Sequence, residues 1–110
     1  GHIAAIADRD GIIALHGVPR KELLDKPNSP ELERLMEQRK NYLFKAGDCP
    51  IAPAQGEEKY HLGAAAPILS QGDLMGSVLL LLGEQDQPLE PGDQALARAV
   101  AGFLGKQMES

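Results

Sequence analysis

The chain has 110 residues, 43% of them apolar and 25% charged, and a formal net charge of −5 at pH 7. These values indicate one folded domain over residues 1–110. The acidic balance, with no basic stripe, argues against direct nucleic-acid binding. The longest apolar run, around residues 78–82, is too short to cross a bilayer, so we expect no membrane partner. One cysteine fits a reducing, cytoplasmic compartment.

Two short apolar runs open the chain, at residues 3–7 and 12–15, and the turn 8–11 separates them. That turn ends in Asp10-Gly11, a strong hairpin signal, so we predict a β-hairpin here. Residues 19–24 then favour one or two helical turns.

A longer helix is predicted over residues 30–40. Ser29 suits the N-cap and Pro30 the first helical position, while Leu32, Leu35 and Met36 share one side. We expect an extended segment at 42–44 and a long loop over 45–58, because Gly and Pro punctuate that stretch.

A second hairpin is predicted from a strand over residues 59–69, ending near Pro67, a turn at 71–73 and a strand over 74–82. Residues 78–82 are continuously apolar, which indicates that both faces of this strand are covered at the centre of a sheet. Together the elements predict an α+β domain with a central, mostly antiparallel five-stranded sheet flanked by helices.

The last helix, beginning at Pro91, carries more apolar surface than one contact needs. Its apolar arc covers roughly 200°, whereas one packing surface needs about 100°. We interpret it as packing on its own sheet and on a second helix, with small residues allowing close approach; the alternative is deep burial in its own domain. The residues assigned to self-association are Leu96, Ala97, Val100, Ala101, Leu104 and Met108.

Catalytic and metal-binding patterns are sparse. Cys49 and His61 form the one conceivable nucleophile–base pair, but no signature surrounds Cys49, which favours an incidental thiol. His2, His16, His61 and Cys49 lie in separate predicted elements without ligand spacing. We therefore expect no catalytic residue, no metal and no cofactor.

Several stretches match a known family in order along nearly the whole chain. They are Gly1-His2 leading to Asp8-Arg9-Asp10, Leu24-Asp25-Lys26, the run 32–39, Pro67-Ile68, Gly72-Asp73 with Gly76 and Val78, and the closing run 101–109. The chain resembles the C-terminal sensory domains of the stage V sporulation protein T family, transcription regulators of endospore-forming bacteria. The resemblance implies a GAF-like domain.

The resemblance also implies a homodimer. In family members a DNA-binding segment and a linking helix come first, and the linking helix lies beside the C-terminal helix and helps dimerisation. We expect this chain, which begins at the first predicted strand, to lack both, so that the first family helix is missing and DNA is reached only through the absent N-terminal domain.

A small-molecule pocket is the remaining site hypothesis. Tyr42, Phe44 and Tyr60 fall on elements that face one pocket in a GAF-like fold, and Arg39 could neutralise an anionic ligand there. The alternative is that the aromatic side chains fill the core and that Arg39 is solvated or pairs with an acidic side chain, Glu57 or Glu58. The loop 47–58 departs from the family, so the ligand stays unknown.

Three functional hypotheses follow. The first is a small-molecule-sensing and dimerisation module of a sporulation transcription regulator, and the second is a purely structural oligomerisation domain whose pocket is filled. The third is an unrecognised small hydrolase using Cys49 and His61. A cavity behind Tyr42 and Tyr60 would separate the first from the second.

Overall fold

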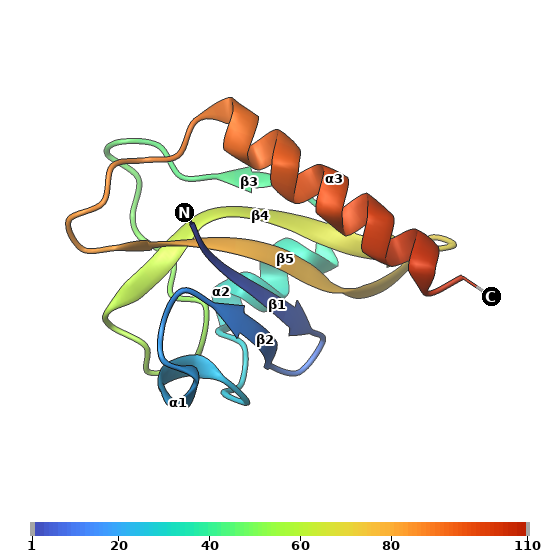
Figure 1. The fold of residues 1–110 in the computed structure, drawn as a ribbon, viewed down its shortest axis with the longest axis horizontal. Helices are drawn as coiled ribbons and strands as arrows, with labels where there is room; N and C mark the ends of the chain where they lie inside the picture. The colour runs from blue at the N-terminus through green and yellow to red at the C-terminus, as the bar shows by residue number, and fades with distance from the viewer. Residues whose placement is uncertain (1, 110) are drawn as a thin grey trace.

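The fold is a five-stranded antiparallel sheet between unequal helical layers. The computed structural model describes residues 2–109 (Figure 1). Within them the sheet order is β2-β1-β5-β4-β3, and every pair is antiparallel. The strands are β1 (Ile3–Asp8), β2 (Ile12–His16), β3 (Tyr42–Leu43), β4 (Tyr60–Ser70) and β5 (Asp73–Gly83). The predicted α+β architecture is confirmed.

The helices are α1 (Arg20–Leu23), α2 (Pro30–Glu37) and α3 (Pro91–Gln107). Helix α3 runs diagonally across one face, while α2 lies behind the sheet on the other and α1 sits beside β2 (Figure 1). The Ser29 N-cap is confirmed, because its Oγ accepts a hydrogen bond from Leu32 N–H at 3.1 Å. Helix α2 is shorter than predicted, since Arg39 adopts a left-handed φ of 53° that ends it.

Strand β5 occupies the centre of the sheet, as the unbroken apolar run predicts. Leu79, Leu80, Leu81 and Leu82 are all buried between the two helical layers. Strand β4 lies one residue later than the predicted range 59–69, and it does not end near Pro67 but continues to Ser70. Strand β3 pairs with β4 only at Ala64 and Ala65, so the β3 side of β4 is an open edge at Pro67. Proline has no backbone N–H, and at an open edge this removes no hydrogen bond between strands.

Two hydrophobic clusters lie on opposite sides of the sheet. The larger, on the α2 side, is built from the strands, α1, α2 and the loop after β3: Ala5, Ala7, Ile12, Leu23, Leu32, Met36, Ala54, Leu62, Ala65, Leu79 and Leu81. The smaller lies under α3: Ala64, Ala66, Ile68, Val78, Leu80, Ala97 and Ala101. The long loop therefore contributes to the core through the fully buried Ala54.

Gly105 lets α3 approach the sheet closely. A Cβ on Gly105 would clash with the carbonyl oxygen of Leu69, which belongs to the backbone and cannot swing away. A Cβ on Gly102 meets nothing within 4 Å, because that residue lies on the outer side of the helix.

We expect Gly105→Ala to lower the free energy of unfolding by about 1–3 kcal/mol, because the added methyl group must push α3 off β4. The matched control Gly102→Ala should raise the free energy of unfolding by about 0.5–1 kcal/mol, because alanine has the higher helix propensity and its methyl group meets no neighbour. Urea denaturation of both variants measures the difference. Equal stabilisation by the two changes would contradict the close contact.

Candidate functional site: the α3 groove and the predicted ligand residues

Helix α3 divides the six predicted self-association residues into a covered and an open set. Ala97 and Ala101 are 1% and 2% exposed beneath the helix, and Leu104 is half-buried. Leu96 is 55% and Val100 38% exposed, and Met108 is exposed near the C-terminus. The expectation that small residues admit a second helix needs correction, because Ala97 and Ala101 instead admit the domain's own sheet.

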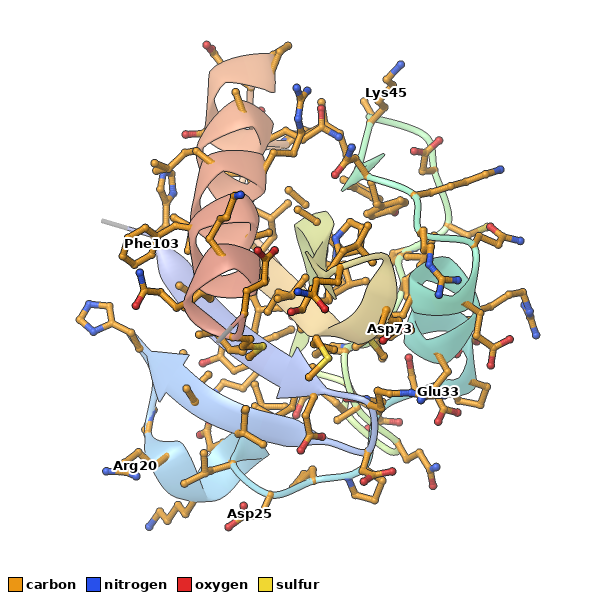
Figure 2. All side chains as sticks on the ribbon, turned by 90° about the vertical axis from the view of Figure 1, so that its right-hand side faces the viewer. Arg20, Asp25, Glu33, Lys45, Asp73 and Phe103 are labelled. Atoms are coloured by element: carbon orange, nitrogen blue, oxygen red, sulfur yellow. The ribbon has the colours of Figure 1, made fainter. Side chains whose placement is uncertain are left out.

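The open apolar side of α3 forms a ridge, which we define as Leu96, Val100 and Phe103. These residues follow one another at spacings of four and three, so they share one side of the helix. Phe103 is 62% exposed, and Figure 2 shows its ring projecting from the flank of α3. Phe103 is not among the residues that the sequence assigned to self-association.

An apolar groove lies beside this ridge, because α3 covers β3, β4 and part of β5 and leaves β1 and β2 open on the same face (Figure 1). The α3 groove has a volume of about 350 Å³. Its lining consists of His2, Ala4, Ala5, Ile6, Ala14, Leu15, His16, Val78, Leu80, Leu96, Ala97 and Val100. Among these described residues there is no Asp, Glu, Lys or Arg.

One polar contact joins the two walls of the α3 groove. His2 Nε2 lies 3.0 Å from Asp93 Oδ1, and Asp93 Oδ2 accepts a hydrogen bond from Glu90 N–H at 3.0 Å. The Asp93 carboxylate therefore both caps the first turn of α3 and holds the segment entering β1.

The predicted ligand residues do not converge on one pocket. Arg39 Nη1 and Nη2 donate to the carbonyl oxygens of Glu37 and Gly72, each at 3.4 Å, which places Arg39 beside the turn between β4 and β5. Tyr60 lies at the opposite end of β4, paired with Gly83. Eleven residues of strand, roughly 30 Å, separate the two ends.

Tyr42 and Tyr60 pack against the α2-side cluster, so the structure favours the alternative in which aromatic residues fill the core. Tyr42 is half-buried on β3, opposite Ala65. Burial raises the pKa of the Tyr42 hydroxyl, and the negative charge of Asp48 raises it further. Phe44 packs instead on His61, with ring centroids 4.7 Å apart.

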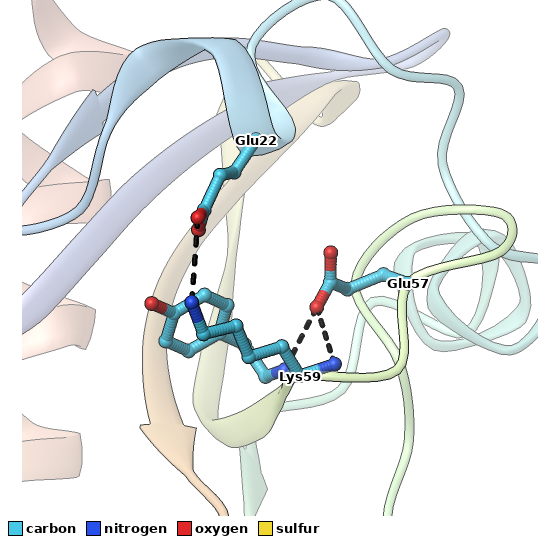
Figure 3. Close-up of polar contacts among 4 residues, drawn as sticks. Glu22, Glu57 and Lys59 are labelled. Carbon is cyan, nitrogen blue, oxygen red and sulfur yellow. Dashed lines mark hydrogen bonds and ion pairs between the residues drawn. The ribbon is translucent and has the colours of Figure 1, made fainter.

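A polar cleft of about 350 Å³ lies at the Tyr60 end of the sheet, lined by Pro50, Ala52, Glu57, Glu58, Lys59, Tyr60, His61 and Glu84. Lys59 Nζ is 3.3 Å from Glu22 Oε1 and lies 5.7 Å from the centre of the Tyr60 ring (Figure 3). The hydrogen bond that Lys59 donates to Glu22, and then the negative charge of Glu22, raise the pKa of Lys59.

Glu57 does not pair with Arg39 as the alternative interpretation allowed. Its Oε2 accepts hydrogen bonds from the backbone N–H groups of Lys59 and Tyr60, at 2.6 and 2.8 Å (Figure 3). Glu57 thus fixes the entry into β4.

Cys49 and His61, the predicted nucleophile–base pair, have different surroundings. Cys49 is exposed on the loop, and His61 is engaged by Phe44 and, through Nδ1, by the carbonyl oxygen of Leu62 at 3.2 Å. No group of three or more His, Cys, Asp or Glu side chains in this range could hold a metal ion. None of the described helices is long and apolar enough to cross a membrane.

Comparison with known proteins gives three findings. A family model described as "Stage V sporulation protein T C-terminal, transcription factor" matches residues 1–109. Stage V sporulation protein T of Bacillus subtilis (strain 168) is 33% identical over 109 residues, which cover 99% of this chain and 60% of that protein. The crystal structure of the GAF domain/HD domain protein from Geobacter sulfurreducens superposes on this chain with a TM-score of 0.62 and 14% sequence identity. The superposition covers 96% of this chain and 80% of the Geobacter chain, and at this identity it supports the fold alone.

We expect the Tyr42 hydroxyl to ionise above its ordinary pH range, because its pKa is raised in the folded state. A raised pKa contributes stability that is present below the unfolded value of about 10 and is lost as pH rises through the folded pKa. Absorbance at 295 nm follows the ionisation. Tyr42→Phe should remove the late-titrating phenol and flatten the alkaline loss of stability; an unchanged titration would contradict the assignment.

Proposed function

The chain belongs to the family of stage V sporulation protein T C-terminal domains, and we propose that within a transcription factor it is the part through which two copies associate. The observation that carries this proposal is the apolar ridge of α3 lying directly beside the apolar α3 groove. Both surfaces face the same side of the sheet, and the described residues that form them include no Asp, Glu, Lys or Arg.

A second copy of this chain suits that surface because ridge and groove lie next to each other. In a twofold dimer each surface patch meets itself, so the ridge of one copy would enter the groove of its partner. Residues 96, 100 and 103 have the spacing with which helices pack into grooves. Covering a large apolar side chain such as Phe103 contributes about 1.5–3 kcal/mol, which favours association.

No carboxylate lines the groove, so the net charge of −5 places no acidic side chain within this contact. We assign DNA contact to the rest of the longer protein, since this chain spans about 60% of the length of its curated relative. Pairing through α3 would then set the distance between two DNA-binding parts.

We expect Val100→Glu to raise the dissociation constant of the dimer by about 30-fold or more, which corresponds to about 2 kcal/mol. The two copies of the dimer would each bring one introduced carboxylate into the apolar contact, where neither has an oppositely charged partner. Sedimentation velocity over a concentration series measures the constant.

Ala95→Glu is the matched control, because Ala95 is exposed on another side of the same helix and receives the same charge. It should leave the dissociation constant within about twofold. A wild-type chain that stays monomeric at high concentration, or a Val100→Glu dimer as tight as wild type, would overturn the proposed function.

Small-molecule sensing is the second candidate, and the polar cleft beside Tyr60 is the observation that favours it. Its volume of about 350 Å³ is at the lower end of ligand pockets, and Lys59 and His61 supply hydrogen-bonding groups. Arg39 is not part of this candidate ligand site, because it lies at the other end of β4 from Tyr60.

A thermal-shift screen against small metabolites tests this candidate. A compound that binds the cleft should raise the midpoint of wild-type unfolding by a few degrees, and Tyr60→Ala should lose most of that shift. Tyr60→Phe separates the ring from the hydroxyl group. A shift that Tyr60→Ala leaves intact would place the compound elsewhere, and a screen without any shift would count against sensing.

A further inference from the structure

We propose that the cleft between α2, the β1–β2 turn and the start of β5 binds a zwitterionic small molecule, one with an ammonium group, a carboxylate and an apolar side chain. This charged cleft is separate from the α3 groove and from the polar cleft beside Tyr60, because it shares no lining residue with either. Binding there would not depend on self-association.

The charged cleft has two adjoining lobes. One lobe, of about 390 Å³, is lined by Arg9, Asp10, Glu33, Met36, Glu37 and Leu74. The other, of about 470 Å³, is lined by Arg9, Glu37, Arg39, Asp73, Leu74 and Met75. Arg9, Glu37 and Leu74 line both lobes, so the lobes form one continuous space of a size that small-molecule sites have. Figure 2 looks onto this end of the molecule, with Glu33 on α2 and Asp73 at the start of β5.

Two guanidinium groups supply the positive charge of the cleft. Arg39 Nη1 and Nη2 donate to the carbonyl oxygens of Glu37 and Gly72, each at 3.4 Å, so the head group bridges the end of α2 and the β4–β5 turn. Within residues 2–109, no carboxylate lies within 4.0 Å of Arg39 or Arg9. Because a guanidinium presents its N–H donors as a fork that matches a carboxylate, these two groups suit the carboxylate of a ligand.

The backbone at Arg39 holds its head group at the cleft. Arg39 has a left-handed φ of 53°, a conformation that a residue with a side chain seldom adopts and that persists where the surrounding structure fixes it. Gln71, in the facing turn, has a φ of 54°. The helix end and the hairpin turn therefore meet at the Arg39 guanidinium, which is anchored by backbone oxygens rather than neutralised by an acidic side chain.

Carboxylates dominate the other lobe. Glu33 and Glu37 are four residues apart on α2, so they share one face of the helix, and Asp10 from the β1–β2 turn lines the same lobe. This lobe holds three carboxylates and one guanidinium, whereas the lobe of Arg39 holds two of each. The ammonium group of a ligand is therefore favoured beside Glu33, and its carboxylate beside Arg39.

An apolar floor lies between these charges. Leu74 lines both lobes and packs against the α2-side cluster, and Met36, which lines the acidic lobe, is 3% exposed. A few placed charges around an apolar floor are typical of a site that orients a small ligand. A ligand that carries an apolar side chain between its two charged groups would use all three features.

Isothermal titration calorimetry with matched probes tests this site, at low ionic strength because salt screens exposed charges. L-Methionine and L-methionyl-L-methionine carry both charges, N-acetyl-L-methionine lacks the ammonium group, and L-methioninamide lacks the carboxylate. We expect at least one of the two zwitterions to bind, and the blocked compounds to bind about tenfold more weakly or not at all. Binding of the amino acid alone or of the dipeptide alone would show whether the ligand is a free amino acid or a short peptide.

Variants of the cleft locate the binding. Arg39→Gln, Arg9→Gln and Glu33→Gln should each raise the dissociation constant of the bound zwitterion by about tenfold, because each removes one charge of the lining. Arg98→Gln is the matched control, since Arg98 is exposed on α3, and it should leave the constant within about twofold. Should Arg39→Gln melt early, Arg39→Asn takes its place, because asparagine tolerates the left-handed conformation.

Three results would each overturn the proposed site. They are the absence of binding by both zwitterions, blocked compounds that bind as tightly as the zwitterions, and binding that persists in both Arg9→Gln and Arg39→Gln. None of these results bears on assembly, since sedimentation velocity should give the same dissociation constant for the Arg9→Gln dimer as for wild type.

Discussion

The close contact between α3 and the sheet determines which part of that sheet face is covered and which apolar side chains of α3 stay exposed. Ala97, Ala101 and Gly105 form the inner side of the helix, and Gly105 brings its backbone against the backbone at Leu69. A helix held so near β4 cannot also spread over β1 and β2, because its inner side chains are too short to bridge a wider gap. Half of the sheet face therefore stays open, and the larger apolar residues of α3 are left on its flank.

That arrangement separates two roles that small and large residues play on one helix. The small residues fix the position of α3, whereas Leu96, Val100 and Phe103 keep 55%, 38% and 62% of their surface exposed and so contribute less burial to the folded chain. Exposed apolar area in a ridge beside a groove is unusual for a monomer and typical of an interaction surface. Stability and assembly should therefore respond to different substitutions on the same helix.

The sequence predicted the order of elements, the central position of β5 and the Ser29 cap, because these depend on local patterns: an unbroken apolar run, a turn signal and a capping residue. It predicted a wide apolar arc on α3. It did not predict which residues of the arc the sheet covers and which stay exposed, since helical periodicity does not say which part of an arc meets the sheet. The grouping of Arg39 with Tyr60 failed for a similar reason. Arg39 was predicted at the end of a helix and Tyr60 near the start of a strand, but the distance between them depends on strand register and length, which only the folded sheet fixes.

The two sides of the sheet bear differently on sensing and assembly. On the α2 side, Ala54 from the long loop and the rings of Tyr42 and Tyr60 join the core, so the space expected for a ligand holds protein side chains instead. Near Tyr60 a polar cleft lies at the edge of the sheet. On the α3 side the groove is apolar, open and adjacent to a matching ridge. A ligand at the Tyr60 cleft would have to act across the sheet through β4, whose residues contact both clusters, whereas a change at the α3 groove would act directly on the proposed assembly. The second route needs fewer coupled elements, which is why assembly, rather than sensing, is the function the geometry supports best.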